Sequence, residues 1–303
     1  MDKLSKYQKN LYSQNGEDGI ILEVLSRLGR LKDSNSGTNW CVEFGAWDGI
    51  RGSNTYNLIE NHNYISVQIE PDKKKFKELE KNLDPTKHVL INSFVEIDGK
   101  YSLDQILHRA SIPINFDLLS IDVDGMDYHI WEATRNFRPK VVCIEFNPTI
   151  PGHVDFIQER NFKVSQGSSL KSVIELAKTK KYTLVAITHC NLIFVCSEDA
   201  SKVIGDLESQ EIVGSHESVF KPNFLFLGYD GSVHLTQKVL FPWHEIEIDE
   251  NELQFLPKII RSYPPNYSFL QRLLFLLFRL NRMRFRGGFI HIVSIFQRIL
   301  KLN

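Results

Sequence analysis

The first 200 residues alternate short apolar runs with segments of helical periodicity. The apolar runs have the length of single strands and occupy residues 40–47, 64–70, 88–95, 116–124 and 141–147. Segments with helical periodicity precede, separate and follow them, at residues 20–28, 53–61, 72–83, 102–110, 128–134 and 168–180. Strands that alternate with helices predict a parallel sheet in an α/β protein.

The rhythm changes at residues 182–197. Two apolar runs, 182–188 and 191–197, are separated only by His189 and Cys190. Two residues cannot hold a crossover helix, so these runs are predicted to form an antiparallel hairpin. The whole pattern predicts a Rossmann-like α/β fold, with a seven-stranded, mostly parallel sheet that closes with a C-terminal antiparallel hairpin strand. An ordinary NAD-binding fold has a different layout.

The regular alternation stops beyond Ser197, where short mixed segments and a hairpin-like stretch at residues 229–235 follow. After residue 265, apolar clusters alternate with arginine at helical spacing and are interrupted by two glycines. We therefore expect a C-terminal helical extension made of two amphipathic basic helices. The expected domains are an α/β domain over residues 1–200, an accessory mixed α/β segment over 201–262 and a basic helical tail over 263–303.

Charge is distributed unevenly along the chain. The net charge is −1, yet residues 254–303 contain no Asp or Glu and nine Lys or Arg, which leaves about −10 for the rest. Bulky apolar residues accompany these basic residues, so we expect the tail to contact a membrane surface and not nucleic acid. Packing onto the α/β domain, or onto a second chain in an oligomer, is the alternative. No uncharged stretch in the tail reaches the ~18 residues that a membrane span requires.

Composition bears on the class of protein and its compartment. Hydrophobic residues make up 42% and charged residues 24% of the chain, which is typical of a globular protein and excludes a fibrous or largely disordered one. The four cysteines form no CxxC pair, so we expect reduced thiols. The N-terminus lacks the apolar segment of a signal peptide. These features predict a cytoplasmic protein, or one held peripherally at the inner face of the membrane.

Acidic residues and a glycine follow the first two predicted strands. Glu43 ends the first strand in VEFGAWDG, where Gly45 lets the backbone approach a ligand closely. Glu70 ends the second strand in VQIEPD, where nucleotide-binding α/β folds place an acid against the ribose hydroxyls. The alternatives are a simple glycine turn and a carboxylate that caps the next helix, which Asp72 can do as well. We favour nucleotide binding because Glu43, Gly45 and Glu70 occur together.

Oxygen-bearing side chains also gather after the fourth and fifth predicted strands. Asp122, Asp124 and Asp127 follow the fourth strand in SIDVDGMDYHIWE, and Glu145 and Asn147 end the fifth. Ligands of open α/β sheets bind at the carboxyl ends of the strands, so these residues are expected to cluster. The cluster can hold Mg²⁺, act as a base toward a substrate hydroxyl or orient a cofactor. An EF-hand is not expected, because the rest of its loop spacing is missing.

Histidines and an N-terminal segment are further candidates. His129, His153 and His189 fall near the same edge, and histidine titrates near neutrality, as suits a general base. His153 and His189 stand on loops that a substrate would meet. The segment YSQNGEDGI, which includes Gln14, precedes the first helix and is expected either to cap that helix or to reach the nucleotide as a lid.

Six motifs occur in a fixed order over residues 11–197: SQNGEDGI, VEFGAWDG, VQIEPD, SLDQIL, LLSIDVDGMDYHIWEA and VVCIEFNP. In this order they resemble the FkbM-like branch of class I S-adenosylmethionine (SAM) dependent methyltransferases. The resemblance implies an enzyme that transfers a methyl group from SAM to an oxygen, often a sugar or glycan hydroxyl, in bacterial surface polysaccharide or natural-product biosynthesis. It implies that Glu43 and Gly45 line the methionine moiety, that Glu70 binds the ribose and that Asp122 lies at the reaction centre. Asp124 departs from the family, where Glu is common.

The residue patterns and the resemblance together define three sets of candidate site residues. The catalytic candidates are Asp122, Asp124 and His153. The candidates for cofactor binding are Gln14, Glu43, Gly45, Asp48, Glu70 and Asp122. The candidates for a Mg²⁺ or Mn²⁺ site are Asp122, Asp124, Glu145 and Asn147.

Two other classes of protein are alternatives. A non-catalytic methyltransferase-like module, acting as a partner of glycan-assembly enzymes, has no need of Glu43, Gly45, Glu70 and Asp122 together. An NAD-dependent sugar epimerase or reductase needs a GxGxxG loop and usually a Tyr-xxx-Lys pair, and neither stands in the right place here.

Overall fold

A computed structural model describes residues 4–31, 39–219, 223–241 and 244–284. The chain divides into two compact units, Met1–Pro222 and Asn223–Asn303. We describe each unit by itself. The finer division expected from the sequence, with boundaries after residues 200 and 262, stays a prediction.

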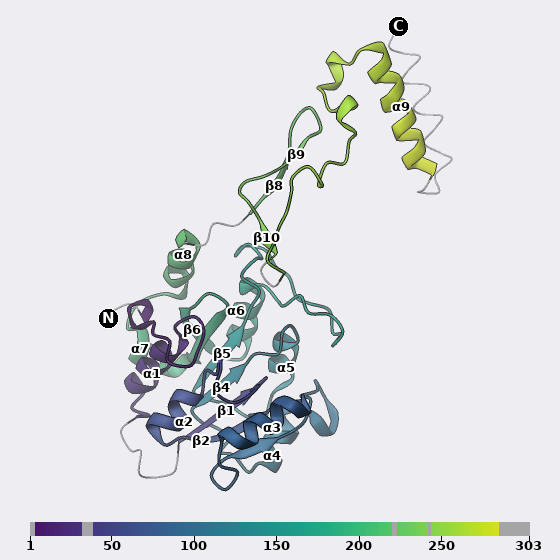
Figure 1. Cartoon of the computed structure of the whole chain (residues 1–303). Helices are drawn as coiled ribbons and strands as arrows, with labels where there is room; N and C mark the ends of the chain where they lie inside the picture. The colour runs from purple at the N-terminus through teal and green to yellow at the C-terminus, as the bar shows by residue number, and fades with distance from the viewer. Residues whose placement is uncertain (1–3, 32–38, 220–222, 242–243, 285–303) are drawn as a thin grey trace. The chain divides into compact units, whose positions relative to one another are not determined.

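The N-terminal unit contains the predicted seven-stranded sheet, in the order β3-β2-β1-β4-β5-β7-β6 (Figure 1). All neighbours pair in parallel except β7, which lies antiparallel between β5 and β6. The predicted mostly parallel sheet and its hairpin are therefore confirmed. The strands are β1 Trp40–Phe44, β2 Ile65–Ile69, β3 Val89–Ile91, β4 Leu118–Ile121, β5 Val141–Glu145, β6 Tyr182–Ile187 and β7 Asn191–Cys196.

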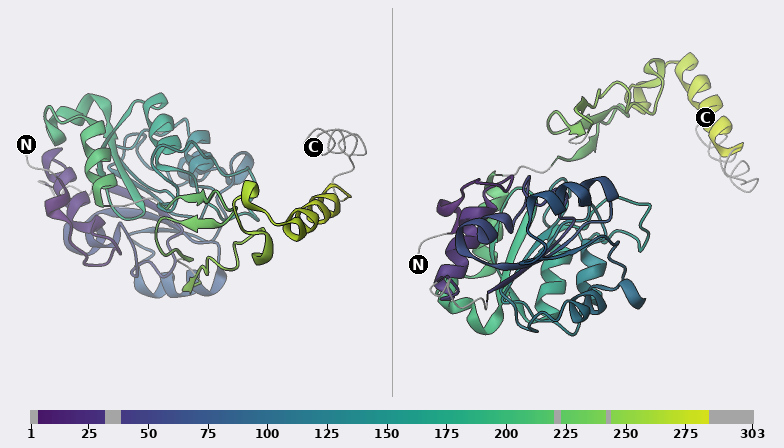
Figure 2. Two further views of the ribbon diagram at one scale, coloured as in Figure 1. Left: turned by 90° about the horizontal axis from the view of Figure 1, so that it is seen from above. Right: turned by 60° about the horizontal axis from the view of Figure 1, so that its bottom comes forward.

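Helices cover both faces of this sheet (Figure 2). One face packs against α4, α5 and α6, and the other against α1, α2, α3 and α7. The helices of this unit are α1 Glu17–Arg27, α2 Tyr56–His62, α3 Lys73–Asn82, α4 Leu103–Arg109, α5 Asp127–Ala133, α6 Leu170–Thr179, α7 Ala200–Ile204 and α8 Ser209–Val219. Short 3₁₀ helices stand at Leu4–Tyr7, Gly99–Tyr101 and Ser197–Asp199.

The two-sided cover explains why the strands read as continuous apolar runs. Side chains alternate between the faces of a strand, so Val42 and Phe44 join the core on one face while Cys41 joins the core on the other. All three are fully buried. A strand buried on both faces has no polar side to show in its sequence.

The loop before α2 differs from its prediction. Helical periodicity predicted a helix over residues 53–61, but α2 starts at Tyr56, and Thr55 at its N-cap makes no side-chain capping bond. The donors of this loop are used elsewhere, because Ser53, Asn54 and Thr55 all donate hydrogen bonds to the buried carboxylate of Glu43. A buried carboxylate without donors is costly, so these side chains serve Glu43.

The C-terminal unit is built from small elements. Two antiparallel pairs, β8 with β9 and β10 with β11, precede the helix α9. The predicted first tail helix is α9, and the predicted second one falls on residues outside the described part of the chain. Across the described residues, no helix is both long enough and apolar enough to cross a bilayer. The bounds are β8 Leu225–Leu227, β9 Val233–Leu235, β10 Leu240–Phe241, β11 Ile246–Glu247, α9 Phe269–Arg284, and 3₁₀ helices at Lys258–Ile260 and Pro264–Asn266.

Candidate functional site

The strand order reverses between β1 and β4, because the chain proceeds from β1 outward to β3 and then returns to β4 on the other side of β1. Open α/β sheets bind ligands at the carboxyl ends of the strands beside such a reversal. The candidate residues Gly45 and Asp122 stand at this point, each directly after its strand. The fold therefore places the two halves of the expected site next to each other. The nucleotide half consists of Glu43, Gly45 and Glu70, and the acidic half consists of Asp122, Asp124 and Glu145.

Gly45 is required by the protein backbone itself. Its φ is +78°, and a Cβ on this residue would lie 1.8 Å from the carbonyl oxygen of Asp122. The sequence suggested that a ligand approaches this glycine, whereas the structure shows that the end of β4 occupies the space beside it. The glycine thus allows the loops after β1 and β4 to meet.

Glu43 is buried, and both of its carboxylate oxygens accept hydrogen bonds. Oε2 accepts hydrogen bonds from Ser53 Oγ at 2.5 Å and Thr55 Oγ1 at 2.7 Å, and Oε1 accepts one from the Asn54 N–H at 2.8 Å. Burial raises the pKa of Glu43, and these donors act in the opposite direction. In this arrangement Glu43 positions the loop between β1 and α2.

Glu70 is also buried, yet it keeps acceptor capacity. Its Oε2 accepts the Trp47 N–H at 2.8 Å and its Oε1 accepts the Asp72 N–H at 2.7 Å. A carboxylate offers about four lone-pair positions, so two remain for hydroxyl groups. Asp72 caps α3 through the N–H groups of Lys74 and Lys75, so the helix does not need Glu70 as its cap.

Trp47 is a residue that the sequence did not single out. It has a φ of +49°, unusual for a bulky side chain, and its ring is exposed with the Lys75 ammonium 4.4 Å from the ring centroid. Its N–H is the group that holds Glu70. Trp47 therefore links the loop after β1 to Glu70, and only its place in the sequence GAWDG could have signalled this.

Asp48 and Gln14 lie around the same loop. Asp48 Oδ1 accepts the N–H groups of Ile50 at 3.0 Å and Arg51 at 2.8 Å, which closes a turn. Gln14 is exposed, and its side chain packs against Gly52, where an added Cβ would lie 2.6 Å from Nε2. The structure brings both residues to the loop after β1, and their direct contact with a cofactor stays a prediction.

The N-terminal segment is held by two buried acids. Asp18 Oδ2 accepts three successive N–H groups, from Leu11, Tyr12 and Ser13, at 2.7–2.8 Å. Glu17 is buried at the start of α1, and Gly16 at the N-cap has no side chain, so the expected side-chain cap is absent. Instead of capping, the acids fold the segment into a loop.

Glu17 ties this loop to the carboxyl edge of the sheet. Its Oε1 accepts hydrogen bonds from Thr188 Oγ1 at 2.5 Å, directly after β6, and from Asn191 Nδ2 at 3.2 Å, at the start of β7. Its Oε2 accepts the Asn15 N–H at 2.7 Å. The segment therefore spans from the loop after β1 to the hairpin, along the edge where the candidate site lies.

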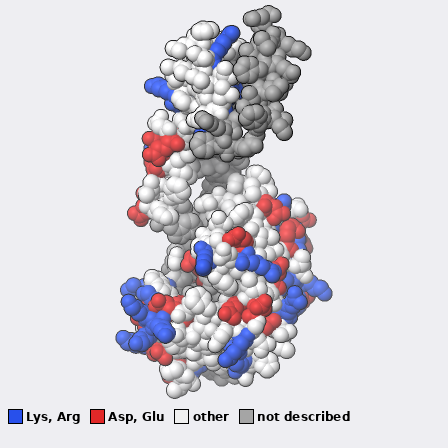
Figure 3. Space-filling view, turned by 90° about the vertical axis from the view of Figure 1, so that its right-hand side faces the viewer, with Lys and Arg blue, Asp and Glu red and all other residues white. Residues whose placement is uncertain are grey.

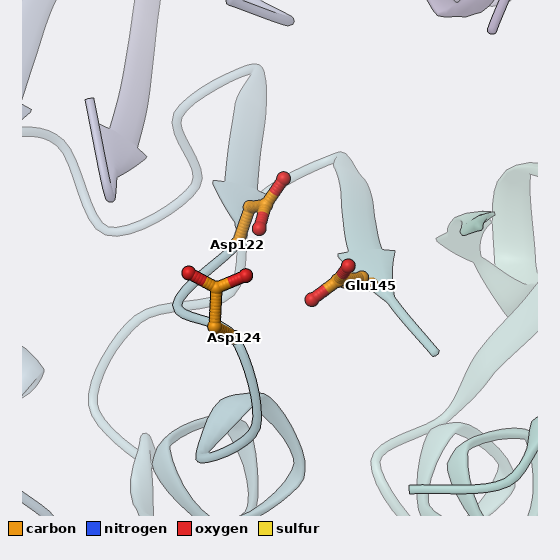
Figure 4. Close-up of side chains that lie close together, drawn as sticks. All are labelled: Asp122, Asp124 and Glu145. Carbon is orange, nitrogen blue, oxygen red and sulfur yellow. The ribbon is translucent and has the colours of Figure 1, made fainter. Parts of the chain in front are cut away.

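Asp122, Asp124 and Glu145 converge at the ends of β4 and β5 (Figure 4). One carboxylate oxygen from each residue lies within 4.8 Å of the other two. No donor in the described part of the chain forms a hydrogen bond or ion pair with any of the three. Burial and the mutual repulsion of the carboxylates raise the pKa of Asp122 and of Glu145 far above the ordinary carboxyl range.

Asp127 belongs to the loop and not to this cluster. Its two oxygens accept the N–H groups of Val123 at 2.9 Å and Gly125 at 2.8 Å, which shapes the turn between β4 and α5. The turn gives Asp124 a φ of +56°. Asp127 thus holds the backbone that presents Asp124.

Asn147 and the histidines have other surroundings. The Asn147 amide donates to the Gln166 carbonyl at 2.7 Å and accepts the Thr149 N–H at 2.8 Å, so both of its ends are used within the loop after β5. Its role as a metal ligand stays a prediction. His153 is exposed on that loop, beside Gly152, which lines a groove of about 430 Å³ between α6 and α8.

The histidine candidates His129 and His189 differ in solvent exposure. His129 is buried, with Nε2 2.6 Å from the Gln158 carbonyl oxygen, and so is part of the packing under the loop. His189 is exposed in the turn between β6 and β7. Of the two, only His189 stands where a substrate can reach it.

Gln158 is a second residue that the sequence did not reveal. Its buried Oε1 accepts the N–H groups of Gln166 at 2.7 Å and Gly167 at 2.9 Å, and its Nε2 donates to the Val164 carbonyl at 2.7 Å. An added Cβ on Gly125 would lie 2.5 Å from the same Oε1. One amide therefore orders the long loop after β5 and abuts the turn that carries the acidic cluster.

Comparisons with known proteins give structural neighbours only. No family model matches the sequence, and no curated protein matches it. Three similar solved structures illustrate the neighbours. TrmK of M. capricolum with S-adenosylhomocysteine is 14% identical, with a TM-score of 0.35 over 62% of this chain and 73% of that chain. The O-methyltransferase of Bacillus cereus with the same ligand is 14% identical, with a TM-score of 0.38 over 63% of this chain and 96% of that chain.

The third neighbour is CalS10, an amino pentose methyltransferase of Micromonospora echinaspora bound to SAM. It is 11% identical, with a TM-score of 0.35 over 62% of this chain and 99% of that chain. Two of the three are named as methyltransferases, and each of the three structures contains SAM or S-adenosylhomocysteine. At such identities and TM-scores they assign no activity to this chain.

Proposed function

We propose that this chain is a SAM-dependent O-methyltransferase of the FkbM-like branch, acting on a sugar or glycan hydroxyl in bacterial surface polysaccharide or natural-product biosynthesis. One observation carries the proposal: the unpaired carboxylates of Asp122, Asp124 and Glu145 lie next to the loop after β1, at the reversal of strand order. A cofactor site and a cluster of potential bases therefore share one edge. The order of motifs over residues 11–197 supports the choice of cofactor.

The nucleotide half would bind the cofactor SAM. SAM supplies a methyl group already activated on a sulfonium, so the protein has mainly to position the reactants. Glu70 would accept the ribose hydroxyls with the lone pairs left free by Trp47 and Asp72. Glu43 would support cofactor binding indirectly, because it holds the loop between β1 and α2 in place. Gln14 and Asp48 would contact the cofactor beside Gly45.

The acidic cluster of Asp122, Asp124 and Glu145 would bind the acceptor and assist the loss of its hydroxyl proton. In the transfer, the carbon–sulfur bond breaks as the new carbon–oxygen bond forms, and the acceptor hydroxyl loses its proton. Asp122 would take that proton, because it follows β4 at the reversal of strand order and no donor among the described residues occupies its carboxylate oxygens. Asp124 would orient the hydroxyl, and His153 would contact the acceptor from the loop after β5.

A divalent cation fits the same residues. Asp122, Asp124 and Glu145 offer oxygen ligands, the donors that Mg²⁺ and Mn²⁺ prefer, and no protein cation among the described residues neutralises them. We propose that these three residues hold Mg²⁺ or Mn²⁺, with Asn147 as a further candidate ligand. When bound, the ion would lower the pKa of an acceptor hydroxyl beside it.

Cofactor binding is the first test. Calorimetric titration of the full chain with SAM, S-adenosylhomocysteine and NAD should show binding of the first two and none of NAD. A chain that binds NAD and not SAM would be an epimerase or reductase, and the proposal would be wrong. A chain that binds SAM but transfers no methyl group to any sugar or glycan acceptor would fit the non-catalytic module instead.

The acidic cluster is tested by matched substitutions. Asp122→Asn and Asp124→Asn should each lower methyl transfer by at least about 100-fold, the usual contribution of a general base, and Asp124→Asn should leave SAM affinity within about twofold. Asp98→Asn is the control, because Asp98 is exposed and makes no side-chain hydrogen bond. Unchanged turnover in the first two variants would remove the cluster from the mechanism.

A further inference from the structure

The helix α9 presents an apolar face to solvent. Phe269, Leu270, Leu273 and Leu277 are all exposed, Phe269 to 85%. Their spacing places them within about 100° of the helix circumference, at roughly 100° per residue. A helix on the surface of a globular protein normally turns polar residues outward, so this arrangement is reversed.

The packed side of α9 is a different one. Phe275 meets the ring of Tyr267 with 5.6 Å between centroids, and Phe278 meets Phe255 at 5.8 Å. These contacts set the rotation of α9 within the C-terminal unit. The exposed leucines therefore do not belong to the core that anchors the helix.

Positive charge accompanies this face. Residues 254–303 carry nine Lys or Arg and no acidic residue. Arg272 and Arg279 are exposed on α9 and stand seven residues apart, on one flank of the apolar face. In Figure 3 one end of the C-terminal unit shows only white and blue atoms among those described.

Further exposed apolar side chains lie in the same unit. In β8 both faces are open, since Leu225, Phe226 and Leu227 are all exposed, although alternate residues of a strand point in opposite directions. Tyr229 in the turn that follows is exposed to 92%. Exposed apolar surface of this extent marks an interaction site.

We propose that the outward face of α9, formed by Phe269, Leu270, Leu273 and Leu277 with Arg272 and Arg279 beside it, binds the surface of an anionic lipid bilayer. Apolar side chains that enter the boundary between headgroups and acyl chains, with basic residues at the level of the anionic headgroups, are the pattern of helices that lie on membranes. The charge complementarity favours anionic lipid, because no acidic residue after position 253 opposes it. The proposal is independent of the reaction that the N-terminal unit catalyses.

Vesicle flotation of the full chain tests the proposal. The chain should float with vesicles of phosphatidylcholine and phosphatidylglycerol, stay behind with phosphatidylcholine alone, and be released as salt is raised. Leu273→Glu with Leu277→Glu should abolish flotation. Phe94→Glu with Ile114→Glu is the matched control, because it places the same two negative charges at exposed apolar positions of the N-terminal unit and should still float.

A second pair of variants removes charge without adding any. Arg272→Gln and Arg279→Gln should each lower the affinity for the anionic vesicles about fivefold, as expected for one basic residue near such a surface. Circular dichroism of every variant shows that its fold is retained. Equal flotation with neutral and anionic vesicles, or none with either, overturns the proposal. A dimer in sedimentation that is broken by Leu273→Glu, without flotation, would assign the face to a second copy of the chain.

Discussion

The Cα of Gly45 faces the carbonyl oxygen of Asp122, and a Cβ on residue 45 would lie 1.8 Å from that oxygen. This close approach joins the loop after β1 to the end of β4. It follows that a substitution at Gly45 displaces the nucleotide half and the acidic half of the candidate site relative to each other.

Gly45→Ala should be far more harmful than a glycine substitution elsewhere. Gly29 is the matched control, because its φ of +71° is similar and an added Cβ would meet nothing within 4 Å. We expect Gly29→Ala to lower the free energy of unfolding by about 1 kcal/mol, from the strain of a positive φ alone. Gly45→Ala should cost roughly 2–5 kcal/mol and abolish SAM binding, because overpacking adds to that strain. Urea unfolding measures both, and equal losses would contradict the close contact.

Glu70 and Asp72 should separate cofactor affinity from stability. Glu70→Gln removes acceptor capacity at the proposed ribose site, so SAM affinity should fall at least about tenfold, near the worth of a hydrogen bond to a charged group. Asp72→Ala removes the cap of α3 and should cost about 1 kcal/mol of stability with SAM affinity unchanged. Calorimetry and thermal unfolding report the two quantities. Equal weakening of SAM binding by both variants would mean that Glu70 acts only through the loop.

Gln158 is expected to order the loop after β5. Gln158→Ala leaves three backbone groups without their partner and should lower the free energy of unfolding by roughly 2–4 kcal/mol. Proteolysis within residues 147–168 should become faster. Gln166→Ala is the control, because that side chain is exposed and makes no hydrogen bond to any residue that the structure describes, so its loss should be within about 0.5 kcal/mol. If both variants resist protease equally, the amide of Gln158 does not hold the loop.

The acidic cluster should make stability depend on pH. Because the pKa of Asp122 and of Glu145 is raised by folding, the folded chain holds more protons than the unfolded chain above a pH of about 4. Stability of the metal-free chain should therefore fall as pH rises from about 4 toward the raised pKa values. Saturating Mg²⁺ should restore the Tm at the upper end, where the carboxylates are charged.

Asp122→Asn with Glu145→Gln isolates this effect. Other carboxylates add to the repulsion at Asp122, namely Glu17, Glu43, Asp124 and Asp127. The double variant should flatten the fall of Tm with pH and remove the response to Mg²⁺. A Tm of the parent chain that rises over this pH range would contradict the raised pKa values of Asp122 and Glu145. A Mg²⁺ response that survives in the double variant would place the Mg²⁺ site elsewhere.

The pattern of the sequence predicted the sheet because its signal is local. Runs buried on both faces stay apolar throughout, and a gap of two residues between the last runs leaves room only for a hairpin. The position of β7 between β5 and β6 was not predicted, because a hairpin can place either of its strands beside β5. Helix starts were less well predicted, as at α2, because capping residues can be drawn to a partner that is distant in the sequence.

The sequence predicted where the candidate site lies, but it predicted only some of the contacts that its residues make. Acids at the ends of parallel strands must meet at one edge, which placed Asp122, Asp124 and Glu145 together. Asp127 comes from the same motif but faces the backbone of its own turn. No sequence signal marks Gln158, whose partners are set by the path of a long loop.

By itself, the sequence determined the α/β architecture, the edge that holds the candidate site and the basic, acid-free character of the C-terminal tail, because strand length, helical period and charge are properties of neighbouring residues. Only the tertiary structure decided that Glu43 serves its loop, that Gly45 meets the end of β4, and that the leucines of α9 face outward. Each of these features depends on contacts between residues that are far apart in the sequence. Side-chain partners are chosen by packing and by the need of buried polar groups for hydrogen bonds, and these act between residues that the sequence holds apart.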